Sequence, residues 1–417
     1  MRIESVAKKI SENGGRLYLV GGAVRDKLLN KVNCDEDYCV TGLTTEDFEK
    51  IFPEAIKRGR AFEVYDLEGS EFALARYDIK EAPGHKGFKV VTGRDIAIEQ
   101  DLKRRDITIN AIAKDVLTEE IIDPFNGIED IRNKIIRATS QSFIEDPLRA
   151  YRVARFASEF EFEVEENTIG LMRGLRDELP TLSKERVFTE FRKALKSTHP
   201  SIFFEVLRKA EILDVHFKEI YHLIGAIQPI KYHPEGDSYN HTLIALENCC
   251  RLTDNVVIRF STLVHDLGKG ETPKDMYPHH YGHAKRGIGL VKKLGNRIGV
   301  PKVWVKCGAT GCFEHMRGGL FYKMSVKKQV DFIEKVDKSL LGLQGLQIVV
   351  YSDRNRTGEY EYEKDIDEQY NFYDIGKKML SEVDGEYIKR EYNISEGVEF
   401  GIKLREERIK WMSKNQK

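Results

Sequence analysis

The first 137 or so residues alternate between apolar runs typical of strands and spacings typical of helices. Strands are predicted at residues 17–21, 38–41 and 71–77. A short helix is predicted at residues 24–29, between the first two strands, and another is expected to begin within residues 106–113. Alternation of this kind predicts a small α/β domain.

The pattern changes at about residue 142, after which apolar positions recur at the spacing of helices. The predicted helices lie at residues 145–156, 168–176, 184–196 and 201–213. The predicted loops lie at residues 181–183, 229–239 and 271–282. Strand signals largely disappear, and the charged tail from residue 359 is expected to be helical. The second part of the chain is therefore predicted to be all-α, and the whole chain α+β.

The composition is that of an ordinary soluble protein. Of the 417 residues, 41% are hydrophobic and 32% are charged, and no apolar run approaches the roughly 18 residues that cross a bilayer. The first residues show no secretory signal, because no apolar stretch follows the initial charge. Six cysteines without a Cys-x-x-Cys pair favour reduced thiols over a zinc or disulfide framework. We therefore expect a cytoplasmic protein.

Charge leaves the class of partner open. The formal net charge is −1, which argues against a wholly basic nucleic-acid binder. Arginine and lysine are nevertheless in local excess over residues 131–155. That excess is compatible with a phosphate backbone as partner.

A site for Mg²⁺ and a nucleoside triphosphate is predicted near the N-terminus. Gly21 and Gly22 end an apolar run and precede a helix-like segment, so their N–H groups can face an anion. Asp35 and Asp37 are spaced i and i+2 on a strand-like segment, which points both side chains to one face. Such carboxylates repel each other unless a cation lies between them. Glu71 is expected to supply a third carboxylate.

Arginines near this site are suited to hold the phosphates. Arg25 lies one helical turn after the glycine pair, and Arg104 and Arg105 are expected to open a helix. Asp106 and Asn110 would share one face of that helix at i and i+4. Their polar side chains are suited to a ribose.

Asp146 and Arg149 are predicted to select the base. They would project together at i and i+3 from a helix whose first turn tolerates Pro147. A carboxylate accepts from the amino group of cytosine or adenine, and a guanidinium donates to ring nitrogens or a carbonyl, so guanine and uracil would be rejected. Each of these motifs alone is common in turns and surface ion pairs. Their order and spacing together carry the prediction.

The chain resembles the class II, or bacterial-type, tRNA nucleotidyltransferases, the CCA-adding enzymes, over residues 17–156. The segments that match are GGAVRD (21–26), DED (35–37), RRDITINAIA (104–113), DPFNGIEDI (123–131) and EDPLRAYRVARF (145–156). The resemblance implies a polymerase-β-type nucleotidyltransferase α/β head followed by an all-α neck and body. In that family the head adds C, C and A to the 3′ end of tRNA from CTP and ATP, without a nucleic-acid template.

The resemblance also implies roles for individual residues. Asp35 and Asp37 match the Mg²⁺ ligands of the head, and Asp146 and Arg149 match a protein template for the base. The arginines that match nucleotide-contacting positions are Arg104, Arg105, Arg152 and Arg155. Residues 77–93 match the family's flexible loop, which argues against an enzyme that adds only CC.

Four alternatives stay open. Bacterial poly(A) polymerases share the head, but their basic segment leading into an Arg-Leu-x-His-Val-like stretch is not visible at residues 58–65, which favours CCA addition. An enzyme that adds only the terminal A fits the same motifs. The intact Asp35, Asp37, Arg105 and Asp146 argue against a phosphohydrolase with an inactive head. A non-catalytic tRNA-binding protein is tested by replacing Asp35 and Asp37 with Ala.

Histidine marks a second centre, because nine of the eleven histidines lie between His216 and His315. The residues that could form a mixed nitrogen and oxygen metal site are His241, His265, Asp266 and Asp353. Imidazoles favour a transition metal, and carboxylates leave room for Mg²⁺ or Mn²⁺. Such a metal can activate a water against a phosphoester, with Lys269 or a histidine neutralising the phosphate.

This region resembles the HD phosphohydrolase domain of some bacterial CCA-adding enzymes. The matching segments are KYHPEGDSYNHT (231–242), LVHDLGKGETP (263–273), HHYGHAKRG (279–287) and YSDRNRTG (351–358). The resemblance implies a phosphatase or 2′,3′-cyclic phosphodiesterase that acts on tRNA ends and uses Mg²⁺, Mn²⁺ or Ni²⁺. The residues that match its metal ligands are His241, His265, Asp266 and Asp353, while His280 and His283 match less definitely.

Four parts of the chain follow from these assignments. The expected parts are a nucleotidyltransferase head (1–139), a helical neck and body that selects nucleotides and binds tRNA (140–225), an HD phosphohydrolase domain (226–358) and a helical tail (359–417). The expected partners are tRNA, CTP and ATP, with no membrane. The sequence does not distinguish a monomer from a homodimer.

Overall fold

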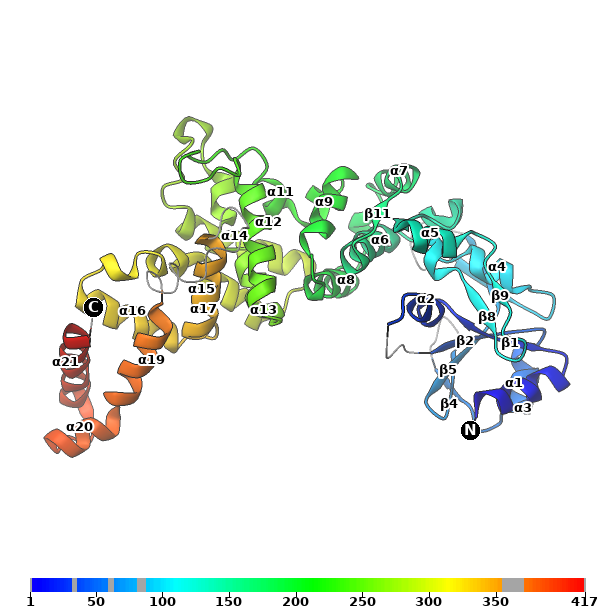
Figure 1. The fold of residues 1–417 in the computed structure, drawn as a ribbon, viewed down its shortest axis with the longest axis horizontal. Helices are drawn as coiled ribbons and strands as arrows, with labels where there is room; N and C mark the ends of the chain where they lie inside the picture. Colours follow the sequence, from blue (N-terminus) through cyan, green and yellow to red (C-terminus); the bar gives the residue numbers. More distant parts are fainter. Residues whose placement is uncertain (1, 32–35, 59–63, 81–87, 355–370, 416–417) are drawn as a thin grey trace. The chain divides into compact units, whose positions relative to one another are not determined.

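The computed structural model describes residues 2–31, 36–58, 64–80, 88–354 and 371–415 (Figure 1). The chain divides into two compact units. The first unit comprises Met1–Glu190 and Ile202–Ile212, and the second comprises Phe191–Ser201 and Leu213–Lys417. Over the described ranges, no helix is long and apolar enough to cross a membrane.

The first unit is built around a mixed sheet in the order β3-β4-β5-β2-β1-β8-β9. Its strands are β1 (Arg16–Val20), β2 (Asp37–Thr41), β3 (Ile56–Arg58), β4 (Val64–Leu67), β5 (Ser70–Leu74), β8 (Ala113–Asp115) and β9 (Ile121–Ile122). β2 and β5 pair in parallel, and the other neighbours pair antiparallel. The strands predicted at 17–21 and 38–41 are confirmed as β1 and β2.

Helices cover both faces of this sheet. The covering helices are α1 (Ile3–Glu12), α2 (Gly22–Leu28) and α3 (Thr45–Ile51) on one face and α4 (Ile98–Lys103) on the other. Along β1, Leu17 and Leu19 enter the first core, and Tyr18 and Val20 enter the second. A strand buried on both faces reads as a continuous apolar run rather than an alternating one.

Two predictions in the first unit are corrected. The strand expected at 71–77 is two strands, because β5 ends at Leu74 and β6 (Arg76–Lys80) forms a separate hairpin with β7 (Phe88–Thr92). The flexible loop expected at 77–93 is thus a hairpin in its described part, and residues 81–87 lie outside the described residues.

The helix expected to begin within 106–113 is the second correction. Arg104 follows the end of α4, and the chain continues through a single 3-10 turn, Thr108–Asn110, into β8. The Asp106 carboxylate accepts the N–H of Ile107, whose backbone is extended. A short acidic side chain that bonds the neighbouring backbone in this way competes with helix formation.

The rest of the first unit is mainly helical. The elements that follow β9 are α5 (Gly127–Asn133), β10 (Ile135–Ile136), α6 (Leu148–Phe160), β11 (Glu163–Val164), α7 (Glu166–Gly174), α8 (Lys184–Lys196) and α9 (Ser201–Lys209). The helix predicted at 184–196 is confirmed as α8. The one predicted at 145–156 starts later, because a 3-10 turn occupies Gln141–Glu145. The one predicted at 201–213 is divided between α9 and α10.

The described part of the second unit is helical. Its helices are α10 (Leu213–His216), α11 (Lys218–Tyr221), α12 (Ser238–Leu252), α13 (Val256–Leu263), α14 (His283–Ile298), α15 (Lys302–Gly318), α16 (Val326–Asp337), α17 (Gly342–Arg354), α19 (Phe372–Glu382), α20 (Gly385–Tyr392) and α21 (Gly397–Asn415). Met379 of α19 and Met412 of α21 share a core with Phe332 of α16. The α+β class is confirmed, and the described part of the predicted tail is helical, as α19, α20 and α21. Residues 359–370, 416 and 417 of that prediction lie outside the described residues.

Candidate functional sites in the two units

The Gly21-Gly22 turn brings the end of β1 against Arg105. Gly21 has a φ of +67°, a conformation that side chains with a Cβ rarely adopt. A Cβ on Gly21 would lie 2.5 Å from Arg105 Nη1. Arg105 Nε is buried without a hydrogen-bond partner, while its Nη2 donates to Asp101. Arg105 is thus aimed at the turn where the sequence predicts phosphate.

Two of the predicted carboxylates lie side by side at one end of the sheet. Asp37 is opposite Val20, the last residue of β1, and opposite Glu71 in the parallel pair of β2 and β5. Partners in register point to the same face, and both of these carboxylates are exposed. Asp35 lies outside the described residues. Two carboxylates this close repel each other unless a cation lies between them. Carboxylate oxygens are the hard ligands that Mg²⁺ prefers, so the pair fits a Mg²⁺ ion.

Asp106 and Asn110 are brought together as predicted, but in a network inside the protein. Asn110 Nδ2 donates to Asp106 Oδ1 at 3.0 Å, and Arg152 Nε donates to Asp106 Oδ2 at 2.7 Å. Arg25 Nη1 donates in turn to Asn110 Oδ1. Burial would raise the pKa of Asp106, but the Arg152 charge and the Asn110 hydrogen bond outweigh it and hold this pKa below its usual range.

Arg104 and Arg155 have partners within the first unit. Arg104 Nη2 donates to the buried Asp101 at 2.6 Å. Arg155 is buried, donates to Glu190 at 2.6 Å, and lies 3.7 Å from the centre of the Phe156 ring. Contact of either arginine with a nucleotide stays a prediction.

The side chains of Asp146 and Arg149 are held by different partners. Arg149 donates to the carbonyl oxygens of Ser142 and Arg104 at 2.5 and 2.6 Å. Asp146 Oδ1 accepts the N–H of Leu148 at the start of α6, and Asp146 Oδ2 accepts from Arg186 of α8 at 2.8 Å. Arg186 Nη1 is buried without a hydrogen-bond partner. Arg186 therefore joins the predicted base-selecting pair.

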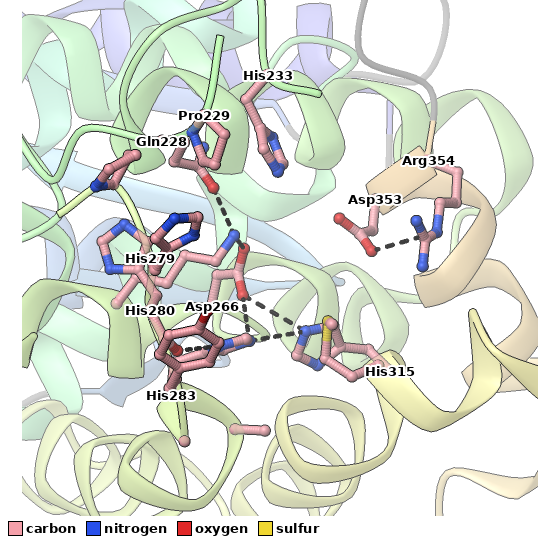
Figure 2. Close-up of a pocket in the computed structure, with 16 residues that line it drawn as sticks. Gln228, Pro229, His233, Asp266, His279, His280, His283, His315, Asp353 and Arg354 are labelled. Carbon is pink, nitrogen blue, oxygen red and sulfur yellow. Dashed lines mark hydrogen bonds and ion pairs between the residues drawn. The ribbon is translucent and has the colours of Figure 1, made fainter. Parts of the chain in front are cut away.

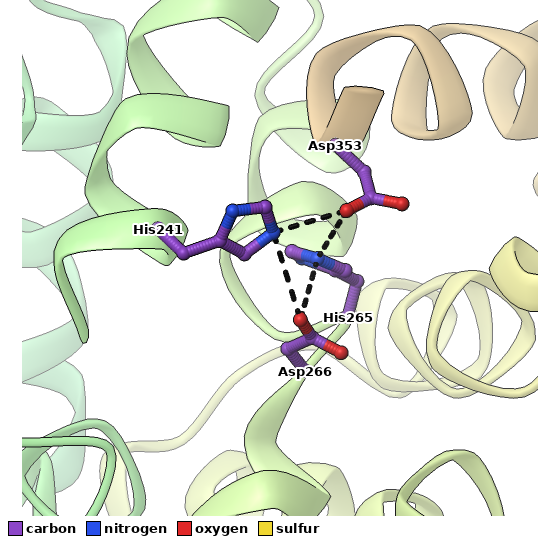
Figure 3. A group of neighbouring side chains, drawn as sticks. All are labelled: His241, His265, Asp266 and Asp353. Atoms are coloured by element: carbon purple, nitrogen blue, oxygen red, sulfur yellow. Dashed lines mark hydrogen bonds and ion pairs between the residues drawn. The ribbon is translucent and has the colours of Figure 1, made fainter. Parts of the chain in front are cut away.

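In the second unit, four predicted residues converge from separate elements (Figure 3). Nε2 of His241, on α12, lies 3.0 Å from Asp353 Oδ1, on α17, and 3.7 Å from Asp266 Oδ2. Nε2 of His265 lies 3.2 Å from Asp266 Oδ2 and 3.7 Å from Asp353 Oδ1. All four residues are buried, and their ligand atoms could reach one metal ion. We call them the His–Asp cluster.

Hydrogen bonds at Nδ1 fix the orientation of these imidazoles. His265 Nδ1 faces the Thr262 carbonyl oxygen at 2.6 Å, and His241 Nδ1 faces Glu235 Oε1 at 2.7 Å. A carbonyl or carboxylate oxygen only accepts, so each Nδ1 carries a proton and Nε2 is the nitrogen left to bind a metal. This arrangement of outer partners is typical of metal-binding histidines.

A second set of ligands shares Asp266. Nε2 of His283, at the start of α14, lies 3.3 Å from Asp266 Oδ1, and Nε2 of His315, on α15, lies 3.4 Å from the same oxygen. Both Nδ1 atoms face backbone carbonyl oxygens, those of His280 and Cys312. The approach requires Gly268, because a Cβ there would overlap the backbone of His283. Asp266 therefore has ligand partners at both oxygens.

The buried polar atoms of this cluster fit a cation. Asp266 Oδ1, Asp266 Oδ2 and His265 Nε2 have no hydrogen-bond partner of ordinary geometry. Burial would lower the pKa of His265, but Asp266 and Asp353 raise it to about 10. Burial lowers the pKa of His283 to about 4. Two buried carboxylates that face several imidazole nitrogens form a set of ligands typical of a metal site.

Comparison with known proteins was made for the whole chain. Residues 17–137 match the family described as "Poly A polymerase head domain", and residues 161–223 match "Probable RNA and SrmB- binding site of polymerase A". A "Multifunctional CCA protein" of Mannheimia succiniciproducens is 40% identical over 354 residues, which cover 82% of this chain and 84% of the relative. This chain belongs to the multifunctional CCA protein family. A member from Psychromonas ingrahamii is 39% identical over the same share of the chain and 86% of its own.

Solved structures agree with this family in fold. "The structure of CCA-adding enzyme apo form II" has a TM-score of 0.67 at 19% identity and covers 98% of this chain and 90% of its own. "Thermotoga maritima CCA-adding enzyme complexed with tRNA_CCA" has a TM-score of 0.64 at 18% identity, with coverage of 99% and 91%. The head-domain match and the relatives confirm the resemblance to CCA-adding enzymes and to the polymerase-β-type head, and the solved structures agree in fold.

Several site residues of this family member escaped the sequence analysis. Arg186 lies in an ordinary amphipathic helix, forty residues from Asp146, and carries no local signal. Glu235 and His315 do have one, since both lie within the histidine-rich region, but their spacing from His241 and Asp266 identifies no motif. His283 was noted only as a less definite match, and its partner at Asp266 is visible only in three dimensions.

Proposed function

We propose that this chain adds cytidine, cytidine and adenosine to the 3′ end of tRNA, using CTP and ATP and no nucleic-acid template. The observation that carries the proposal is the register of β1, β2 and β5. It places Asp37 and Glu71 side by side at the end of the sheet that leads into the Gly21-Gly22 turn. Kinship with multifunctional CCA proteins, and solved CCA-adding enzymes with tRNA, CTP and ATP in their descriptions, support these substrates.

The reaction follows from the residues at the head. The terminal hydroxyl of tRNA attacks the α-phosphorus, so that the new P–O bond forms as the bond to pyrophosphate breaks. Asp35, Asp37 and Glu71 would hold Mg²⁺, which supplies positive charge to the triphosphate and acidifies the attacking hydroxyl. Arg105 binds phosphate oxygens at the glycine turn. Asp146, held by Arg186, accepts a hydrogen bond from the amino group of cytosine or adenine.

Incubation of the protein and Mg²⁺ with a tRNA that ends at its discriminator base tests this function. CTP and ATP are supplied separately and together, and the products are sized. Three added nucleotides with both substrates support CCA addition. One nucleotide added only to a tRNA that already ends in CC indicates an A-adding enzyme, and a long adenosine tail indicates a poly(A) polymerase.

Asp37→Asn tests the carboxylate site. We expect a loss of about a thousandfold in rate, because several kcal/mol of charge stabilisation depend on the metal. Glu119→Gln, which alters an exposed carboxylate of the same unit, is the matched control. Full activity of Asp37→Asn would rule out this site.

The His–Asp cluster supports a second function, metal-dependent hydrolysis of phosphoesters. The observation that favours it is the convergence of four imidazole Nε2 atoms, those of His241, His265, His283 and His315, on the buried Asp266 carboxylate. His241, His265, Asp266 and Asp353 would hold Mg²⁺, Mn²⁺ or Ni²⁺, and His283 and His315 would hold a second ion that shares Asp266. A metal there would lower the pKa of a bound water. Lys269, 2.5 Å from Asp266, would neutralise the phosphate.

Hydrolysis of adenosine 2′,3′-cyclic monophosphate with each of the three metals tests the cluster. Asp353→Asn should abolish hydrolysis, and EDTA should do the same to the unaltered protein. Asp337→Asn, on helix α16 of the same unit, is the control. Hydrolysis that survives both Asp353→Asn and EDTA would contradict the proposal.

Within this proposal the chain keeps the four parts expected from its sequence. Residues 1–139 form the head, 140–225 the neck and body that bind nucleotide and tRNA, 226–358 the HD phosphohydrolase domain and 359–417 the helical tail. The free cysteines of the described chain, four of them buried, suit the reducing cytoplasm.

A further inference from the structure

A cavity of about 460 Å³ opens beside the His–Asp cluster (Figure 2). Asp266, Asp353 and Lys269 line it together with Arg354. Its volume is in the range of about 300–1,000 Å³ that is usual for small-molecule sites. The cavity therefore offers the candidate metal ligands and two positive side chains to one bound molecule.

Two aromatic rings line the same cavity. His279 and Tyr281 stack with ring centroids 5.6 Å apart and an angle of 22° between their planes. Tyr281 is 71% exposed, although a large ring of this kind is ordinarily at least half-buried. A single exposed aromatic residue needs no explanation, but a parallel pair at a cavity lined by metal-ligand side chains does.

The backbone that carries this pair is anchored on both sides. His280 Nδ1 lies 2.9 Å from Thr272 Oγ1, and His280 Nε2 lies 3.0 Å from the Ile227 carbonyl oxygen. Arg286 Nη1 donates to the Tyr281 carbonyl oxygen at 2.6 Å. These hydrogen bonds fix the backbone of the segment, while the Tyr281 ring is exposed to solvent.

We propose that the His279–Tyr281 stack is a platform for the nucleobase of a substrate whose phosphate enters the cavity. The proposal rests on the phosphohydrolase function of the cluster and adds to it a subsite for the base of a nucleotide substrate. Because the ring centroids are only 5.6 Å apart, a base does not fit between the two rings. The base instead extends the stack on the outer face of Tyr281. Stacking tolerates every base, because each has a π-face.

Kinetics with two matched phosphomonoesters test the platform. Adenosine 2′-monophosphate carries a base, and glycerol 2-phosphate does not. Tyr281→Ala should raise KM for the nucleotide about tenfold or more, the usual effect of losing one stacked base, with kcat within about twofold. Tyr281→Phe keeps the ring and should behave as the unaltered protein. KM for glycerol 2-phosphate should not change in either variant.

The matched control is Tyr392→Ala, which removes a partly exposed tyrosine from the tail. If Tyr281→Ala leaves KM for the nucleotide unchanged, or raises KM for both substrates equally, the platform is wrong. An effect seen only with intact tRNA, and not with the mononucleotide, would assign Tyr281 to the tRNA body and would also overturn the proposal.

Equilibrium binding separates this proposal from the phosphohydrolase function. Isothermal titration calorimetry measures Kd of adenosine 2′-monophosphate for the unaltered protein and for Tyr281→Ala, with Mn²⁺ present. If the unaltered protein hydrolyses neither ester, the phosphohydrolase function fails. A tenfold weaker Kd in Tyr281→Ala then still supports the platform, and an equal Kd overturns it.

Discussion

At the scale of single residues, hydrogen bonds between side chains fix the orientation of the polar groups in the head. Asp106 is held by Asn110 and Arg152, and Asn110 is held by Arg25. Asp146 is held by Arg186. A carboxylate that reads the edge of a base must keep one orientation, and a charged hydrogen bond to a fixed guanidinium provides it. Under the base-selecting role that we propose for Asp146, Arg186 would be a positioning residue.

Arg186→Met tests that role. We expect kcat/KM for CTP and ATP to fall by roughly tenfold to a hundredfold, because losing one charged hydrogen bond costs about 1.5–3 kcal/mol. Selection against UTP and GTP should weaken at the same time, as measured by the ratio of kcat/KM values. Arg173→Met, at an exposed arginine of α7, is the control. An unchanged ratio with a lower rate would make Arg186 merely structural.

At the scale of elements, the turn from β1 to α2 shows how the fold forms the head site. Its backbone conformation excludes most residues, and the Arg105 guanidinium fills the space where a Cβ would lie. Position 21 therefore favours glycine for two separate reasons. One is local and the other is tertiary.

Gly21→Ala should lose stability through both the backbone conformation and the contact with Arg105, and Gly14→Ala through the backbone conformation alone. Gly14 also has a positive φ, +82°, but nothing lies within 4 Å of its Cβ position. A left-handed Ala costs about 1–2 kcal/mol, which is the loss expected for Gly14→Ala. Gly21→Ala should lose more, because its ψ of −129° lies outside the left-handed region and because Arg105 must also move, and its KM for nucleotides should rise. Urea unfolding and steady-state kinetics measure the two effects. Equal losses would exclude the contact with Arg105.

The stability of the protein should depend on pH through His216, in the short helix α10. Burial and the nearby Arg297 charge lower the pKa of His216 to about 4. Between about pH 6.5 and pH 4 the unfolded chain binds a proton there and the folded chain does not, so stability decreases as pH falls through this window. The two pKa values differ by roughly 2.5, and each pH unit contributes about 1.4 kcal/mol, so the maximum is about 3 kcal/mol.

His216→Gln removes that contribution. Between pH 7.5 and pH 4.5 the free energy of unfolding should fall by about 2–3 kcal/mol less in the variant than in the unaltered protein. Urea unfolding at both values measures the difference, which cancels the titration of groups common to both proteins. His222→Gln, at an exposed histidine nearby, should show no gain. The same gain in both variants would contradict the assignment to His216.

At the scale of the whole molecule, the two proposed activities belong to different compact units. Asp37 and Glu71 lie in the first unit, and every member of the His–Asp cluster lies in the second. Each unit has its own core, so a polar substitution in one site leaves the packing of the other unchanged. The two chemistries should therefore be separable by substitution.

Asp37→Asn and Asp353→Asn test this separation when each variant is assayed for both reactions. Asp37→Asn should lose nucleotide addition and keep hydrolysis of the cyclic nucleotide. Asp353→Asn should lose hydrolysis and keep addition within about twofold. Circular dichroism confirms that both variants are folded. A variant that loses both activities while remaining folded would show that the two sites are coupled.

The sequence by itself determined what depends on near neighbours. Apolar periodicity is local, so β1, β2 and α8 could be predicted almost to the residue, as could the change to helices after the head. The glycine pair and the spacing of Asp35 and Asp37 are also local, and they indicated the nucleotide addition that the chain's family supports. The adjacent His265 and Asp266 are local as well, and the hydrolysis predicted from them stays a prediction.

Only the tertiary structure decided which distant groups meet. Periodicity failed at residues 106–113, because the Asp106 side chain competes with the helix for backbone N–H groups. Arg186 reaches Asp146, Glu235 orients His241, and His283 and His315 meet at Asp266, across separations that no spacing encodes. Such contacts depend on how helices pack, and packing is set by the summed burial of many side chains rather than by any one of them.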